Sequence, residues 1–138
     1  MSEIYVFDAC ALIALLSKEK GYENVEKIIK ESKSNNTEII MNKINLYEVY
    51  YNICKTYDEY SAMKFLNEIK LSPIKINDEI NDNVLINAGK LKIKYKMSLA
   101  DSFGLAETII SNGIFVTADH HELDIVDKSE KIKFLWIR

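Results

Sequence analysis

IYVFDACALIALL, residues 4–16, joins a short apolar run to an acidic residue and then to a second apolar run. The first run, Ile4–Phe7, is rich in residues that favour strands, and it stops abruptly at Asp8. Asp8 is a favourable N-cap residue, so Ala9–Leu16 is predicted to form a helix. A buried strand that runs directly into a helix is typical of an α/β fold.

The same alternation continues along the chain. Further strands are predicted at residues 38–41, 74–76, 114–116 and 132–136, and helices at residues 23–32, 43–57, 59–69, 78–91, 99–111 and after residue 120. Short strands that alternate with helices imply a parallel sheet with helices on both faces, so we expect a three-layer α/β/α sandwich. With one proline and four glycines, no linker is visible, and we expect one domain over residues 1–138.

Composition excludes several classes of protein. The chain is 48% hydrophobic and 28% charged, which is typical of a globular protein and not of a disordered one. Its net charge of −3 argues against broad non-specific binding of nucleic acid, so any contact with nucleic acid needs a local basic patch. No apolar run is long enough to span a bilayer and no basic segment opens the chain, so we expect a cytoplasmic protein. Cys10 and Cys54 form no metal-binding pair, and we expect reduced, buried thiols.

Acidic residues follow two of the predicted strands. Asp8 comes directly after the first strand, and Asp119 follows the strand at residues 114–116. In open parallel sheets, ligands bind beyond the carboxyl ends of the strands, so both carboxylates should lie at one edge. Asp101 lies in the first turn of the helix that leads to the second of these strands, and Gly104 would leave room for a ligand beside it. Crowded carboxylates need cations or protons, and hard oxygen ligands suit Mg²⁺ or Mn²⁺.

Each acid also has an ordinary structural explanation. Asp8 and Asp119 are natural N-caps, and Asp101 could complete a capping box with Ser98. Glu48 lies on the less apolar side of its helix, where a solvated glutamate is common. The joint placement of the acids at one sheet edge favours a metal site over these separate explanations.

Four segments of the chain resemble the PIN-domain family, which includes the toxins of VapBC toxin–antitoxin systems. The segments are FDACALIALL, INLYEVYY, MSLADSFGLAET and VTADHHELD, in this order and spread over nearly the whole chain. The resemblance implies a parallel α/β/α sandwich and an Mg²⁺- or Mn²⁺-dependent ribonuclease. Carried over position by position, it implies metal-binding and catalytic roles for Asp8, Glu48, Asp101 and Asp119, with Thr117 as a supporting hydroxyl.

The resemblance also implies a substrate, a partner and an alternative. The substrate would be RNA, cleaved by metal-assisted hydrolysis of phosphodiester bonds, and the partner would be a small antitoxin protein. Many relatives carry Ser or Thr within two residues of the first Asp, where this chain has Ala9 and Cys10. A catalytically silent PIN-like module that binds RNA or a protein is therefore the alternative.

Basic residues precede Asp101 in a dense run. They are Lys90, Lys92, Lys94 and Lys96. Such a run is either a solvated helix end or a patch that binds RNA phosphates beside the metal site.

Residues near Asp119 and on the helix at residues 43–57 leave further roles open. His120 and His121 match no zinc pattern and are expected to be partly exposed, although a metal or proton-transfer role is conceivable. The following acids are expected at the surface, where one could supply an outer contact to the metal: Glu122, Asp124 and Asp127. Four tyrosines crowd the earlier helix: Tyr47, Tyr50, Tyr51 and Tyr57. A homodimer or a docked antitoxin would suit such a surface.

Overall fold

A computed structural model describes residues 3–34 and 36–138. Within these residues, five strands form one sheet in the order β3-β2-β1-β4-β5, and every neighbouring pair is parallel. The strands are β1 (Glu3–Phe7), β2 (Thr37–Asn42), β3 (Ile74–Asn77), β4 (Ile114–Thr117) and β5 (Lys133–Trp136). The helices are α1 (Ala9–Ser17), α2 (Tyr22–Ser34), α3 (Lys43–Thr56), α4 (Glu59–Lys70), α5 (Asp82–Lys94), α6 (Leu99–Ser111) and α7 (His120–Ser129).

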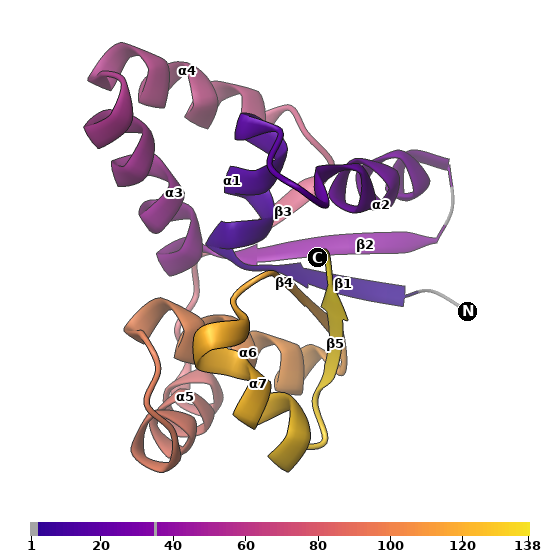
Figure 1. The fold of residues 1–138 in the computed structure, drawn as a ribbon, viewed down its shortest axis with the longest axis vertical. Helices are drawn as coiled ribbons and strands as arrows, with labels where there is room; N and C mark the ends of the chain where they lie inside the picture. The colour runs from indigo at the N-terminus through magenta and orange to yellow at the C-terminus, as the bar shows by residue number, and fades with distance from the viewer. Residues whose placement is uncertain (1–2, 35) are drawn as a thin grey trace.

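Helices cover both faces of the sheet (Figure 1). Helices α1 to α4 lie on one face and α5 to α7 on the other. Successive side chains of a strand point to opposite faces, so Phe7 packs in the core under α1 to α4, whereas Val6 packs in the core under α6 and α7. The expected three-layer sandwich with a parallel sheet is confirmed.

The strand order reverses between β1 and β4. The chain first adds β2 and then β3 on one side of β1, and α5 and α6 then cross back so that β4 pairs with the other side of β1. In open α/β sheets, the crevice beyond the carboxyl ends of the strands at such a reversal is the usual ligand site. Asp8 follows β1 directly and Asp119 lies two residues beyond β4, so the topology brings both acids to this crevice.

The start of α5 differs from the prediction. We expected Asp78 to open this helix, but it begins at Asp82, and the side chain of Asn81 caps it by accepting a hydrogen bond from Val84 N at 3.1 Å. Asn77 Oδ1 accepts a hydrogen bond from Glu79 N at 3.1 Å, which makes a local turn after β3. This turn holds the intervening residues outside the helix.

Helix α6 is buried on more sides than its apolar stripe predicts. It packs against the sheet, α3 and α5. The sequence places Leu99, Phe103, Ala106 and Ile110 on one apolar stripe, which predicts that all four face inward. In the structure, Leu99 and Ile110 are 57% and 43% exposed. Polar residues are buried in their place, among them Asp101 and Glu107. A single stripe describes a helix with one covered face, and α6 is not such a helix.

A buried polar network holds α6 against the sheet edge. Glu107 Oε1 accepts hydrogen bonds from Asn42 Nδ2 at 3.3 Å and from Asn77 Nδ2. Asn42 and Asn77 are register partners at the ends of β2 and β3, and Asn42 is also the N-cap of α3. Buried polar groups are stable only when they are paired, so this network fixes the start of α3 and holds the middle of α6 against the ends of β2 and β3.

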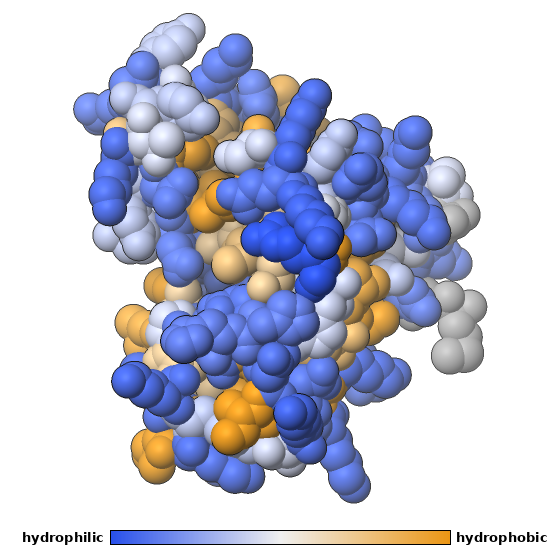
Figure 2. Space-filling model, in the orientation of Figure 1, coloured by the Kyte–Doolittle hydropathy of each residue, from blue (hydrophilic) through white to orange (hydrophobic). Residues whose placement is uncertain are grey.

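Further expectations concern thiols and membranes. Cys10 and Cys54 are free, as expected, but each is only partly buried. In the described part of the chain, no helix is both long and apolar enough to cross a membrane. Hydrophilic side chains cover most of the face shown in Figure 2, and hydrophobic ones gather there in separate patches.

Candidate metal centre

Three carboxylates meet at the carboxyl edge of the sheet. They belong to Asp101 in the first turn of α6 and to Asp119 and Glu122 at the start of α7. One oxygen of each carboxylate lies within 4.8 Å of the corresponding oxygens of the other two. Three carboxylates at this separation repel one another, and a shared hard cation relieves that repulsion.

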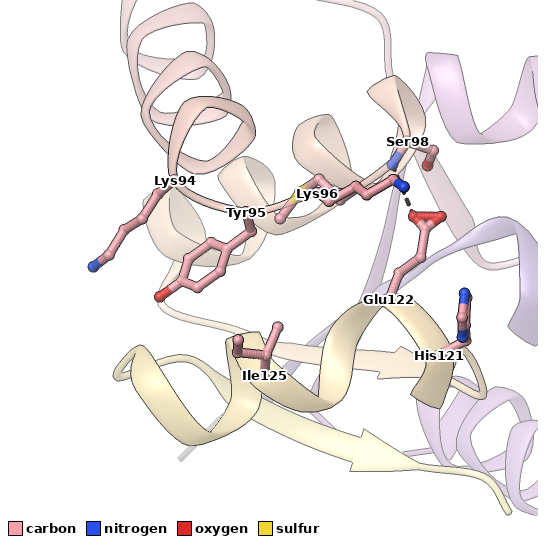
Figure 3. A pocket seen from close by; sticks show the side chains of 8 residues that line it. Lys94, Tyr95, Lys96, Ser98, His121, Glu122 and Ile125 are labelled. Atoms are coloured by element: carbon pink, nitrogen blue, oxygen red, sulfur yellow. Dashed lines mark hydrogen bonds between the residues drawn. The ribbon is translucent and has the colours of Figure 1, made fainter.

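Glu122 is the member of this group that the sequence analysis did not select. It was expected to be a surface acid, but it is half-buried, and its Oε2 accepts a hydrogen bond from Ser98 N at 3.0 Å (Figure 3). Glu122 lies three residues after Asp119, the spacing that places two side chains on one face of a helix. That spacing was the signal that could have identified it.

The same hydrogen bond changes the interpretation of Asp101. In a capping box, the Asp101 carboxylate would accept from Ser98 N, but Glu122 occupies that donor. Ser98 still caps α6, because its Oγ accepts a hydrogen bond from Asp101 N at 3.1 Å. The Asp101 carboxylate is therefore released from helix capping and faces Asp119 and Glu122.

Asp8 lies beside this group, and each of its two carboxylate oxygens accepts a hydrogen bond. Its Oδ1 accepts a hydrogen bond from Ala11 N at 2.9 Å, and its Oδ2 accepts one from the Thr117 hydroxyl at 2.5 Å. Thr117 is fully buried, and its Oγ1 also accepts a hydrogen bond from Asp119 N at 3.1 Å. Thr117 thus joins the side chain of Asp8 to the backbone of Asp119.

Glu48 approaches the group from α3. It is partly buried, and its oxygens lie outside the 4.8 Å group of Asp101, Asp119 and Glu122. Burial raises the pKa of Glu48, and the negative charges of Glu122 and Asp119 raise it further. Glu48 therefore lies in the field of the group as an additional negative charge.

Burial and mutual repulsion raise two of these pKa values to near neutrality. Burial raises the pKa of Asp8 to about 7, against the hydrogen bonds from Thr117 and Ala11, which lower it. Burial, followed by the charges of Asp8, Asp119 and Glu122, raises the pKa of Asp101 to about 8. Carboxyl groups with such values hold protons at neutral pH unless a cation takes their place.

Cys10 lies two residues after Asp8, in the first turn of α1. Its thiol is partly buried, and burial raises its pKa, with further increases from Asp8 and Asp119. The group is therefore a neutral thiol and adds no negative charge to the site.

One unpaired buried atom belongs to an amide that contacts the first turn of α6, the turn that carries Asp101. Among the described residues, Asn45 Oδ1 is the one buried side-chain nitrogen or oxygen that lacks a hydrogen-bond partner. Asn45 Nδ2 donates to the carbonyl of Ala100 at 3.2 Å, directly before Asp101, so the amide orientation is fixed. Mg²⁺ keeps several of its water molecules when it binds a protein. Such a water molecule would donate hydrogen bonds to this amide oxygen and to the carboxylates.

Gly104 does not leave room for a ligand, so that prediction is wrong. A Cβ added at Gly104 would lie 2.8 Å from Phe115 Cε1 and 3.1 Å from Asn45 Nδ2. The small residue instead allows α3 and its Asn45 amide to pack closely against α6.

The predicted basic run is divided by the structure. A hollow of about 680 Å³ borders the carboxylates at Glu122 (Figure 3). It is lined by Lys94, Tyr95, Lys96, Met97, Ser98, His121, Glu122 and Ile125. Lys90 lines a neighbouring hollow, which Lys94 also borders, and Lys92 Nζ donates to the carbonyl of Met97 at 2.9 Å. Of the four lysines, only Lys94 and Lys96 therefore line the hollow beside Glu122.

The two histidines also separate. His120 stacks on Trp136 with ring centroids 3.9 Å apart, and its ring nitrogens lie 2.7 Å from Asp124 Oδ1 and from the carbonyl of Arg138. His121 lines the hollow beside Glu122. As expected, both histidines are exposed at the start of α7.

Comparisons with known proteins agree with this fold. A family model described as PIN domain matches residues 5–129. No match is found among curated proteins. Among solved structures, DNA-bound VapBC from Salmonella typhimurium has a TM-score of 0.71 at 13% identity and covers 100% of both chains. VapBC2 from Rickettsia felis, bound to a promoter DNA fragment, has a TM-score of 0.70 at 19% identity and covers 96% of this chain and 97% of that one.

A third solved structure is VapC20 of Mycobacterium tuberculosis, described as a toxin that cleaves the sarcin–ricin loop. It has a TM-score of 0.61 at 13% identity and covers 82% of this chain and 87% of its own. At these identities the likeness shows a shared fold.

Proposed function

Because this chain belongs to the PIN-domain family, we propose that it is an endoribonuclease that hydrolyses RNA phosphodiester bonds with Mg²⁺ or Mn²⁺. The observation that carries the proposal is the group formed by Asp101, Asp119 and Glu122 at the strand-order reversal. A ligand set made only of carboxylate oxygens matches the preference of these hard cations.

The side chains divide the work of the site. Asp101, Asp119 and Glu122 would hold the cation, whose chemistry is to activate water and to neutralise charge on the phosphate. Once a bound cation displaces their protons, Asp8 and Glu48 would add negative charge behind these ligands, which would strengthen cation binding. Thr117 keeps Asp8 and Asp119 at a fixed separation through its two hydrogen bonds.

We also propose a partner, an antitoxin of the kind present in the similar VapBC complexes. A largely apolar hollow of about 190 Å³ lies between α3 and α4 and is lined by Leu46, Tyr47, Tyr50, Leu66 and the side chain of Lys43. Tyr47, which lines this hollow, is 63% exposed. Tyr57, at the C-cap of α3, is 70% exposed and borders a different hollow. Tyrosines around an apolar hollow suit the docking of an apolar segment of a small protein.

A second candidate function follows from the residues after Asp8. Ala9 and Cys10 replace the hydroxyl that relatives carry, and the Cys10 thiol stays neutral. A catalytically silent PIN-like module would bind the cation and RNA, or a protein, without cutting.

One experiment tests both candidates. A pool of tRNA, rRNA and mRNA is incubated with the protein in Mg²⁺, Mn²⁺ or EDTA, beside the Asp101→Asn variant. Asp58→Asn is the matched control, because Asp58 is also a helix N-cap but lies at α4, outside the site. We expect metal-dependent cleavage that Asp101→Asn abolishes and Asp58→Asn retains.

Other results of the same experiment argue against the nuclease. Cleavage in EDTA, or full cleavage by Asp101→Asn, would contradict a metal-dependent mechanism at this site. Calorimetric binding of Mn²⁺ without cleavage of any RNA would favour the silent module.

A further inference from the structure

We infer that the hollow between the α5–α6 connection (residues 95–98) and α7 binds the RNA strand next to the cleaved bond, and that cation binding at the acidic group strengthens this binding. The inference rests on the proposed function and assigns the part of the surface that holds the substrate.

The hollow and the acidic group share one side chain. Glu122 contributes an oxygen to the group with Asp101 and Asp119, and it also lines the hollow. Its hydrogen bond from Ser98 N holds α7 against the α5–α6 connection, the other wall of the hollow. A phosphate held near the cation would therefore place the neighbouring nucleotide at the mouth of the hollow.

The walls combine cationic and apolar groups. Lys96 and His121 are exposed, and Figure 3 shows the Lys96 side chain extending along the hollow toward Glu122. Lys94 is on the same wall, but its ammonium is paired with Glu130 at 2.8 Å. Lys96 is therefore the lysine of this wall best placed to contact a phosphate.

The apolar part of the wall suits a base or a ribose. Tyr95 and Met97 are 8% and 5% exposed, and the Tyr95 hydroxyl donates to Glu130, so this wall is fixed by its own packing. Ile125 faces them from α7 with 57% of its surface exposed. Single-stranded RNA presents phosphates for cations and unstacked bases for apolar and aromatic faces, and this hollow offers both.

The position of Glu122 couples the two sites. Without a cation, the Glu122 carboxylate repels a phosphate in the hollow, and a bound cation cancels that repulsion. Coupling of this kind is reciprocal, so RNA must also tighten the binding of the cation.

The first test is fluorescence anisotropy with a fluorescein-labelled single-stranded RNA of mixed sequence, titrated in Ca²⁺ at several salt concentrations. Lys96→Ala should weaken binding several-fold and flatten the slope of log K against log salt by about 0.7, the value for one lost contact to a single strand. Ile125→Ala should weaken binding without changing that slope. Lys90→Ala, in the same basic run but outside the hollow, should leave both unchanged.

The second test compares Ca²⁺ with EDTA. Wild type should bind the RNA more tightly in Ca²⁺, and Glu122→Gln should bind it in EDTA more tightly than wild type does. Equal binding by wild type in both conditions would overturn the coupling.

The outcomes separate the two proposals. If wild type cleaves RNA while Lys96→Ala and Ile125→Ala bind as Lys90→Ala does, the substrate hollow is overturned and the nuclease stands. If wild type neither binds nor cleaves RNA, the proposed function itself fails.

Discussion

The Thr117 hydroxyl donates a hydrogen bond to Oδ2 of Asp8, a residue 109 positions earlier in the chain. The bond joins the end of β4 to the end of β1 across the point where the strand order reverses. The same hydroxyl accepts from Asp119 N, so one buried side chain holds two of the predicted site acids. The geometry of the site therefore depends on a residue that needs no contact with the cation.

Thr117→Val keeps the shape of this side chain and removes its hydroxyl. Oδ2 of Asp8 then loses a buried donor, which should cost about 1–3 kcal/mol of unfolding free energy. The hydrogen bond from Thr117 lowers the pKa of Asp8, so its loss should move that pKa above about 7. We expect weaker Mn²⁺ binding at pH 7 by calorimetry, with partial recovery at higher pH.

Thr108→Val is the matched control for this substitution. Thr108 is also buried, but its Oγ1 donates to the carbonyl of Gly104 at 2.9 Å, within α6. This variant should lose stability without a change in Mn²⁺ affinity. An equal loss of affinity in both variants would show that Thr117 acts only through stability.

Stability of the metal-free protein should fall as pH rises. The folded-state pKa values of Asp8 and Asp101, about 7 and about 8, lie above the ordinary value of 3.8. A fold that binds protons more tightly than the unfolded chain is most stable below the unfolded pKa, and it loses that stability as pH rises through the folded values. In EDTA, the melting temperature should therefore decline between about pH 6 and about pH 9.

Two comparisons assign this decline to the site. Mg²⁺ should remove most of it, because the cation replaces the protons. Asp101→Asn should reduce the decline. The pKa of His120 is also raised, by its hydrogen bonds to Arg138 and Asp124, so His120 adds a decline of the same sign to both wild type and Asp101→Asn. A melting temperature that rises with pH in EDTA would contradict the raised pKa values.

The strands could be predicted from the sequence because they are short buried apolar runs whose ends are marked by polar residues. The predicted strands at residues 38–41 and 114–116 lie within β2 and β4, and Asn112 ends α6 in the left-handed conformation, with φ of 54°. The predicted start of α5 was wrong because the turn after β3 depends on a hydrogen bond to the Asn77 side chain, and hydrophobic periodicity carries no information about such a bond.

The site was less accessible to sequence reasoning. Asp8 and Asp119 follow from topology, because strand ends fix their positions. Glu48 was selected by resemblance alone, since its helix pattern is that of a solvated residue. Glu122 was left at the surface, although its spacing from Asp119 on α7 places both on one face. The roles of these acids in binding metal and in catalysis remain predictions.

Glu122→Gln should therefore weaken cation binding strongly. It removes one of three neighbouring carboxylates but keeps an acceptor for Ser98 N, so the link between α6 and α7 should survive. We expect the Mn²⁺ dissociation constant to rise about tenfold or more, as when groups that support a metal are lost. Asp124→Asn, on the exposed side of α7, should leave it unchanged. An unchanged constant in Glu122→Gln would place the cation elsewhere.

Asn45 Oδ1 should act on the hydrated cation rather than on the fold. A buried carbonyl without a donor costs free energy, and water around a cation held by Asp101 would supply the missing donor. Asn45→Ala should weaken Mn²⁺ binding severalfold and alter the electron paramagnetic resonance spectrum of the bound ion. Asn42→Ser, at the N-cap of the same helix, removes the donor to Glu107 while keeping an N-cap side chain, so it should lose stability without either change. If both variants bind Mn²⁺ as wild type does, the role of Asn45 is confined to its bond with Ala100.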